Sequence, residues 1–331
     1  MQGESGMSSI RITCPKAEWN TERRKEELLK QVEEWTRSAH LKSLLTAFGA
    51  EIPNTSFTEY LTWLNQFVDC WDFRKKQAMG GERWSVNDTS EVLKNSELII
   101  TASKVLGFVD RHSPIMKPDF ILPLGGARLT NLERCQYAKV LLDQYGSSNT
   151  VVAALASMRP INEIEMPYLL EYAPKATTEY AAICKGLEKS FSLQKKMYFE
   201  EKGNSQNPNL NWLIREYHQG YNGHKIYSIA APSSQPERRA NSLDTFEFFL
   251  KKFSVPEKSS ILLCTNSIYV NYQLLKFIPL AFEYGLNVDC VGTPIKSKND
   301  FNKLSNYCQE IKGTINAIFA IYQRYTQQLR I

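Results

Sequence analysis

Five short runs of apolar residues, each ending in a turn of small or polar residues, constrain the fold of this chain most strongly. A buried parallel strand has a nearly continuous apolar sequence, and the crossover to the next strand places a helix on the sheet. The pattern therefore predicts a three-layer, Rossmann-like α/β domain with a mainly parallel sheet of about five strands. The runs are Asp119–Leu124, Thr150–Ala156, Lys225–Ala231, Ser260–Cys264 and Asn287–Gly292.

The sequence before the first run has a different periodicity. Within 18–107, apolar residues recur every three or four positions, which indicates three or four helices. We expect an N-terminal helical subdomain at residues 1–110 and the α/β domain at residues 118–331. Helical spacing from Asp300 to Arg330 also predicts a long C-terminal helix, packed either on the sheet or against the N-terminal helices.

An insertion at about residues 177–224 separates the second and third apolar runs. Its first part, Glu179–Leu193, has the apolar spacing of a helix. The polar segment Glu200–Asn211 follows, and its Gly, Asn, Ser, Gln and Pro residues predict a mobile loop or lid.

Composition excludes several classes of protein. Apolar residues make up 43% of the 331 residues and charged residues 23%, as in ordinary globular proteins. The net charge of +5 is small and scattered, so no nucleic-acid partner is expected. We expect no membrane span and no secretory signal, because no apolar stretch is long enough or suitably placed. Seven widely spaced cysteines without a CxxC pair indicate reduced, mostly buried thiols and a cytoplasmic protein.

Motifs for metal and nucleophilic catalysis are missing from the sequence. The four histidines form no HExxH or HxH arrangement, so no metal site is predicted. A GxSxG elbow is also missing, as are the GxGxxG and GxxxxGK[ST] nucleotide-binding patterns. The sequence therefore names no cofactor, and candidate sites must come from the turns at the strand ends.

Ligands of open parallel sheets lie beyond the carboxyl ends of the strands, where turns expose N–H groups and helix N-termini attract anions. The first such turn offers Gly125, Gly126 and Arg128, and a tight turn without a ligand explains the glycines equally well. The second offers Ser157 and Arg159 before Glu163, and a surface Arg–Glu pair is the alternative interpretation.

The third and fourth turns add more polar residues. A helix cap explains one residue of the third turn but not the whole group, so we predict ligand contact there. In the fourth turn, hydroxyl and amide groups precede a tyrosine that is placed to stack on a base or close the site, and a capped helix with core tyrosines is the alternative. The predicted residues are Arg239, Asn241, Asp244 and Thr245 in the third turn, and Thr265, Asn266, Ser267 and Tyr269 in the fourth.

In their order, the four turns resemble those of the YdcF/SanA-like family of bacterial Rossmann-like domains. The resemblance covers 118–293, with an insertion. Leu124–Arg128 is similar to the family's first strand end, with Leu-Gly-Gly and an arginine, and Ser157–Glu163 to its second turn, which is followed by a glutamate. Ala240–Thr245 resembles the Asn-Thr-x-Glu-Asn-like signature, and Cys264–Tyr272 resembles the Val-Thr-Ser-x-Tyr-His turn.

This chain departs from the family at the last turn and at its N-terminus. Where the family has His and then Arg, this sequence has Val270 or Asn271 and then Gln273. The resemblance therefore implies a divergent member with an added helical region. Family members have been linked to envelope permeability and to binding of S-adenosylmethionine, which implies a ligand here that is phosphorylated or contains adenosine.

The leading hypothesis is that the chain binds a nucleotide-like or other anionic small molecule at the carboxyl ends of the strands. If it is an enzyme, we expect hydrolysis or group transfer, with Asp244 or Glu163 as general base and Arg128 and Arg159 stabilising phosphate. One alternative is an interaction protein whose N-terminal helices dock a protein partner. Another is an S-adenosylmethionine-binding protein, which would need an acidic residue where Ser157 stands.

Overall fold

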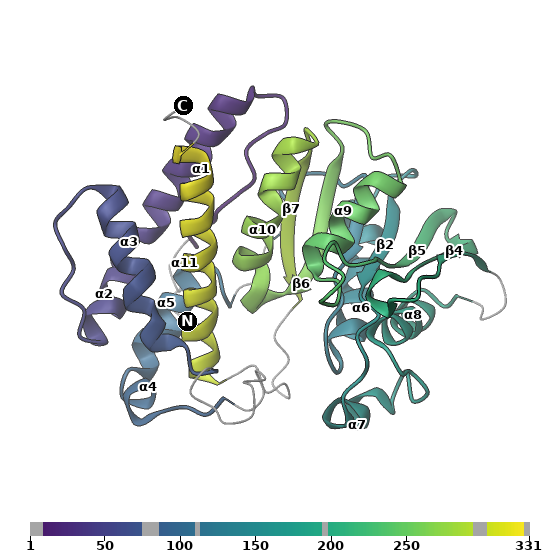
Figure 1. Cartoon of the computed structure of the whole chain (residues 1–331), viewed down its shortest axis with the longest axis horizontal. Helices are drawn as coiled ribbons and strands as arrows, with labels where there is room; N and C mark the ends of the chain where they lie inside the picture. The colour runs from purple at the N-terminus through teal and green to yellow at the C-terminus, as the bar shows by residue number, and fades with distance from the viewer. Residues whose placement is uncertain (1–8, 75–85, 110–112, 194–197, 294–302, 328–331) are drawn as a thin grey trace, which may run out of the picture. The chain divides into compact units, whose positions relative to one another are not determined.

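The computed structural model describes residues 9–74, 86–109, 113–193, 198–293 and 303–327 (Figure 1). Contacts divide the chain into two units. The first unit combines Met1–Arg111 with Ser267–Pro279 and Pro294–Ile331, and the second combines His112–Asn266 with Leu280–Thr293. The C-terminal helix is thus grouped with the N-terminal helices, although it follows the α/β segment in the sequence.

The first unit is helical. Its long C-terminal helix packs against α1, α3, α4 and α5, so the structure shows the second of the two expected packings (Figure 1). A capping box of Ser56 and Glu59 begins α3, and the side chain of Asn20 caps α1. The elements are α1 (Thr21–Thr36), α2 (Ala39–Ala47), α3 (Phe57–Phe67), η1 (Val68–Trp71), α4 (Ser90–Lys94), α5 (Ser96–Val105), η5 (Ser267–Tyr269), the first part of α10 (Val270–Glu283) and α11 (Leu304–Gln327).

The second unit is built on a seven-stranded sheet of order β3-β4-β5-β2-β1-β6-β7. Five adjacent strands are parallel to one another, namely β5, β2, β1, β6 and β7. Numbered along the chain, these five have the order 3-2-1-4-5 of a Rossmann-like sheet, which confirms the predicted fold class. The strands are β1 (Phe120–Pro123), β2 (Val151–Ala156), β3 (Tyr198–Gly203), β4 (Trp212–Tyr221), β5 (His224–Ala230), β6 (Ser260–Asn266) and β7 (Asn287–Thr293).

The insertion differs from the expectation. Its helix is present as α8 (Glu179–Ser190), but the segment predicted as a mobile loop or lid contains the last four residues of β3 and the short 3-10 helix η4 (Pro208–Leu210). The strands β3 and β4 extend the sheet in antiparallel fashion. The sequence concealed β3 because it is an edge strand whose polar side chains, such as those of Glu200 and Glu201, are exposed and show no alternation of apolar and polar residues.

Helices cover both faces of the sheet. Tyr180 and Cys184 of α8 contact Ser228 of β5, and α6 (Thr130–Tyr145) packs beside α8. The neighbouring strand residue Tyr227 instead contacts Phe253 at the end of α9 (Ser242–Lys252). Because successive strand residues point to opposite faces, α8 and α9 lie on opposite faces. The short η3 (Glu163–Glu165) and α7 (Met166–Leu169) connect β2 to α8.

The thiols and the helices agree with two further expectations. The seven cysteines, all within the described residues, form no disulfide, and six of them are buried. Among the described residues, no helix combines the length and the apolar character that crossing a bilayer requires.

Candidate functional site

A cavity of about 430 Å³ lies at the carboxyl ends of β1 and β2. Three segments that are distant in sequence line it: the end of β1, the end of β2 with the start of α8, and the loop that leads into α9. The lining residues are Leu124, Gly125, Leu155, Ala156, Ser157, Arg159, Glu179, Arg238, Arg239, Ala240, Asn241, Ser242 and Thr245. Of the predicted ligand-binding residues, the structure thus brings together Gly125, Ser157, Arg159, Arg239, Asn241 and Thr245.

Gly125 forms the floor of this cavity, where the chain leaves β1. Its N–H donates to the carbonyl oxygen of Leu155, 2.6 Å away. A Cβ atom at this position would collide with the carboxylate of Glu179 and would lie only 3.0 Å from the Cα atom of Ala156. The close approach of Glu179 therefore requires glycine here, which is more than the turn alone would demand.

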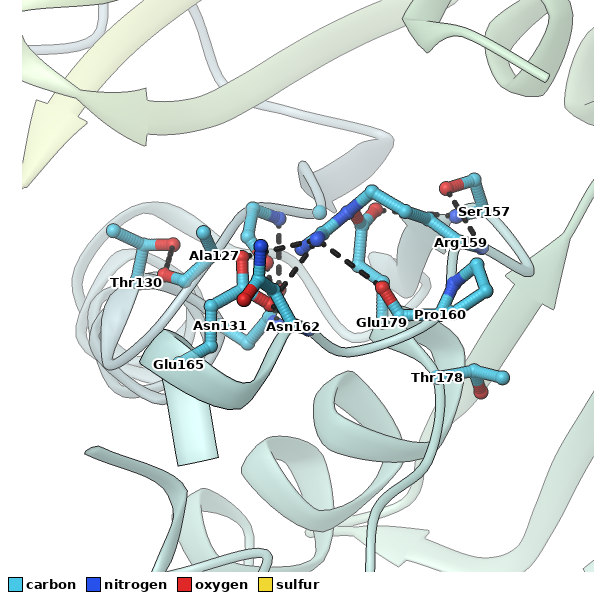
Figure 2. Close-up of polar contacts among 12 residues, drawn as sticks. Ala127, Thr130, Asn131, Ser157, Arg159, Pro160, Asn162, Glu165, Thr178 and Glu179 are labelled. Atoms are coloured by element: carbon cyan, nitrogen blue, oxygen red, sulfur yellow. Dashed lines mark hydrogen bonds and ion pairs between the residues drawn. The ribbon is translucent and has the colours of Figure 1, made fainter. Parts of the chain in front are cut away.

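Arg159 is held by two carboxylates (Figure 2). Its Nε donates to Glu179 at 3.0 Å, and its Nη1 donates to both carboxylate oxygens of Glu165 at 3.0 and 3.1 Å. Burial alone would lower the pKa of Arg159, but Glu179 and Glu165 raise it above its ordinary value. The alternative interpretation named a surface Arg–Glu pair, whereas the glutamates that Arg159 contacts here are largely buried. Glu163 lies exposed on η3, outside the cavity lining.

Glu179 is the carboxylate that faces the cavity. It is the first residue of α8, after the N-cap Thr178, and one of its oxygens accepts the N–H of Ser157 at 3.2 Å. Each carboxylate oxygen has two lone pairs, and the hydrogen bonds from Ser157 and Arg159 occupy one on each oxygen. The remaining lone pairs are free to accept hydrogen bonds from a molecule in the cavity.

Asp244 is committed to the start of α9. It accepts two hydrogen bonds from Arg238, at 2.5 and 3.2 Å, and the backbone N–H groups of Asn241 and Ser234 at 2.7 and 3.3 Å. Burial alone would raise the pKa of Asp244, but the hydrogen bonds from Arg238, Ser234 and Asn241 lower it below its ordinary value. A carboxylate held in this way is a weak proton acceptor, and Asp244 is not part of the cavity lining.

The side chain of Arg239, in contrast, has no carboxylate partner among the described residues. Its exposed guanidinium makes no hydrogen bond or ion pair with any residue that the structure describes, in contrast to the paired side chains of Arg159 and Arg238. Other unengaged donors lie beside it in the lining: the side-chain amide of Asn241, whose oxygen caps α9, and the hydroxyl of Ser242. Ser157 accepts the N–H of Arg159 through its Oγ, so its own O–H is also able to donate.

The remaining predicted residues lie outside this lining. Gly126 exchanges two hydrogen bonds with Asn131, and Arg128 has a left-handed backbone (φ 56°) with its guanidinium 4.5 Å from the ring centre of Tyr168. The hydroxyl of Thr265 is buried and has no hydrogen-bond partner among the described residues. Ser267 and Tyr269 are buried in η5 and belong to the first unit.

The side chain of Asn266 is bound by Arg134, which links the ends of β1 and β6. Its amide oxygen accepts from Nε and Nη2 of Arg134 at 2.9 and 2.6 Å, and Nη1 of Arg134 donates to the carbonyl oxygens of Leu124 and Gly125. Arg134 thus fixes the backbone that forms the cavity floor.

Glu179, Arg238 and Arg134 are not among the residues that the sequence predicted to bind a ligand. The signal for Glu179 was its place directly after Thr178, a residue type that caps helices. For Arg134 and Arg238 no local pattern distinguishes a buried hydrogen-bonding role from a surface position. Among the described residues, no cluster of His, Cys, Asp and Glu is arranged to hold a metal ion.

Comparison with known proteins gives one finding. Residues 20–107 match the family model described as the Rv3785 N-terminal domain. This match covers about a quarter of the chain and coincides with helices α1 to α5. No curated protein and no solved structure gives a significant match. The resemblance to the YdcF/SanA-like family, the cytoplasmic location and the docking of a partner by the N-terminal helices stay predictions.

Proposed function

We propose that this protein binds an anionic small molecule in the cavity at the carboxyl ends of β1 and β2. The observation that carries the proposal is the convergence of three segments, distant in sequence, on one cavity of about 430 Å³. This volume lies in the usual range of small-molecule sites, and the place is the edge at which α/β sheets bind ligands.

The chemistry of the lining favours an anion. The unengaged groups at the α9 end, namely the guanidinium of Arg239, the side-chain NH2 of Asn241 and the hydroxyl of Ser242, all offer hydrogen-bond donors, and only Arg239 carries a charge. Arg159 and Arg238 stay charged, but carboxylates already neutralise them. Arg239 is therefore the group that we expect to hold a phosphate or carboxylate, by charge-assisted hydrogen bonds.

Titration calorimetry of the full chain at low ionic strength tests this proposal. The probes are inorganic phosphate and sugar phosphates such as ribose 5-phosphate. We expect Arg239→Ala to weaken sugar-phosphate binding about 5- to 20-fold, the scale of one partly exposed charge-assisted hydrogen bond.

Arg324→Ala is the matched control, because it removes an equally exposed arginine from α11. It should leave the affinity unchanged. Wild-type protein that binds neither phosphate nor sugar phosphate at millimolar concentration would refute the proposal, as would equal affinities of wild type and Arg239→Ala.

A further inference from the structure

The two walls of the cavity have opposite chemical character. Glu179 and Gly125 belong to one wall, at the start of α8 and the end of β1, and Arg239 belongs to the other, before α9. The helices α8 and α9 lie on opposite faces of the sheet, as their contacts with Ser228 and Tyr227 show. The cavity therefore spans the carboxyl edge of the sheet, with a carboxylate on one side and an arginine on the other.

A carboxylate in a cavity restricts what can lie against it. Glu179 is only 12% exposed through its side chain, and Arg159 balances its charge while sharing itself with Glu165. A phosphate beside Glu179 would meet that carboxylate directly, while the charge of Arg159 is already balanced by Glu179 and the buried Glu165, and like charges repel at this range. The part of a ligand that meets Glu179 is therefore not anionic, and a group that donates hydrogen bonds to the unused lone pairs of this carboxylate fits there.

The apolar part of the cavity lining narrows the chemical class of the ligand further. It consists of aliphatic residues, Leu124, Leu155, Ala156 and Ala240, and no described residue of the lining is aromatic. A nucleobase in a binding site is commonly stacked on an aromatic ring. This lining offers no such ring, whereas hydroxyl groups find an acceptor in Glu179.

Resting on the function proposed above, we infer that the ligand is a phosphorylated polyol or sugar, with its phosphate on Arg239 and its hydroxyl groups on Glu179. Glu179 is then the residue that determines specificity for hydroxyl-bearing phosphates, and Gly125 provides the space that its carboxylate needs. Simple phosphate esters without hydroxyl groups would engage only the Arg239 side.

A matched pair of ligands tests the inference on the wild-type full chain. Glycerol 3-phosphate and propyl phosphate have the same number of carbon atoms and differ by two hydroxyl groups. A site that hydrogen-bonds a hydroxyl group discriminates strongly against an analogue without it. Calorimetry should show glycerol 3-phosphate binding at least tenfold more tightly than propyl phosphate.

The variant Glu179→Gln, checked for folding by circular dichroism, tests the residue itself. It should reduce the ratio of the two affinities, that for glycerol 3-phosphate over that for propyl phosphate, to less than threefold. The reduction should come chiefly from weaker binding of glycerol 3-phosphate. Arg239→Ala should weaken both esters and keep their ratio.

The outcomes separate the two proposals. Equal binding of both esters to the wild type, with both weakened by Arg239→Ala, would overturn the inference and leave the anion site standing. A ratio unchanged in folded Glu179→Gln would overturn the role of Glu179. Absence of binding for both esters and for ribose 5-phosphate would overturn the anion site together with the inference.

Discussion

The carboxylate of Asp244 illustrates how single residues shape this site. It is nearly buried, caps α9 together with Asn241, and holds Arg238 in a two-point ion pair. These contacts use the hydrogen-bonding capacity of the Asp244 carboxylate and pair the guanidinium of Arg238. They explain why Arg239, its neighbour in sequence, is the arginine that is free to meet a ligand.

Asp244→Asn should therefore lower the free energy of unfolding at pH 7 by about 1–2 kcal/mol, through loss of charge-assisted hydrogen bonds. Because the folded-state pKa of Asp244 lies below the ordinary value, its contribution is complete above about pH 4 and is lost as the pH falls through the folded-state pKa. Urea denaturation of wild type and variant at pH 7 and pH 3 measures this. A stability difference that grows on acidification would contradict the assignment.

At the scale of elements, the cavity depends on how the ends of β1 and β6 are joined. Arg134, buried on α6, donates to two backbone carbonyl oxygens after β1 and to the amide oxygen of Asn266 at the end of β6. The Asn266 amide in turn donates to Thr293 of β7 at 3.0 Å. One guanidinium thus fixes strand ends that are distant in sequence.

Arg134→Lys should destabilise the protein by about 2 kcal/mol, because an ammonium group cannot reproduce the forked donors that reach both partners. It should also weaken phosphate-ester binding, since Gly125 loses its support. Urea denaturation and calorimetry measure the two effects. Arg324→Lys, at an exposed position of α11, serves as the control, and a stability of Arg134→Lys equal to that of the control would exclude this role.

At the scale of the whole molecule, the C-terminal helix α11 is paired with the N-terminal part of the chain within the first unit. Lys312 of α11 is buried and lies 2.6 Å from Asp72 and 3.1 Å from Asp69, at the end of η1. Burial alone would lower the pKa of Lys312, but its hydrogen bonds with Asp72 and Asp69 raise it. This pair therefore joins segments that are 240 residues apart in the chain.

Lys312→Met should cost about 3 kcal/mol of stability, because the buried carboxylate of Asp72 loses the ammonium group that neutralises it. The double variant Lys312→Met/Asp72→Leu should recover more than half of that loss, since it removes both charges together. Chemical denaturation of the two variants and of Asp72→Leu completes the cycle. A single and a double variant with equal stability would refute the coupling.

The sequence by itself determined the helices and the five parallel strands but not β3 and β4, because periodicity and caps are local properties. The apolar runs predicted all five parallel strands, and Thr178 and Asn241 stand where helices begin. Local patterns did not reveal β3, whose exposed edge position removes the alternation that marks a strand. They also did not decide which of two expected surfaces α11 covers.

Only the tertiary structure decided which polar residues share a cavity and which are already engaged. Arg159 and Arg239 are the same residue type in similar turns, yet two carboxylates hold the first and the second has no partner among the described residues. The sequence predicted that Thr265 binds a ligand, but Thr265 is buried and lies outside the cavity lining. Glu179, which was not among the predicted ligand-binding residues, faces the cavity. Hydrogen bonds and charges act over a few ångströms in space, and distance in sequence does not fix that separation.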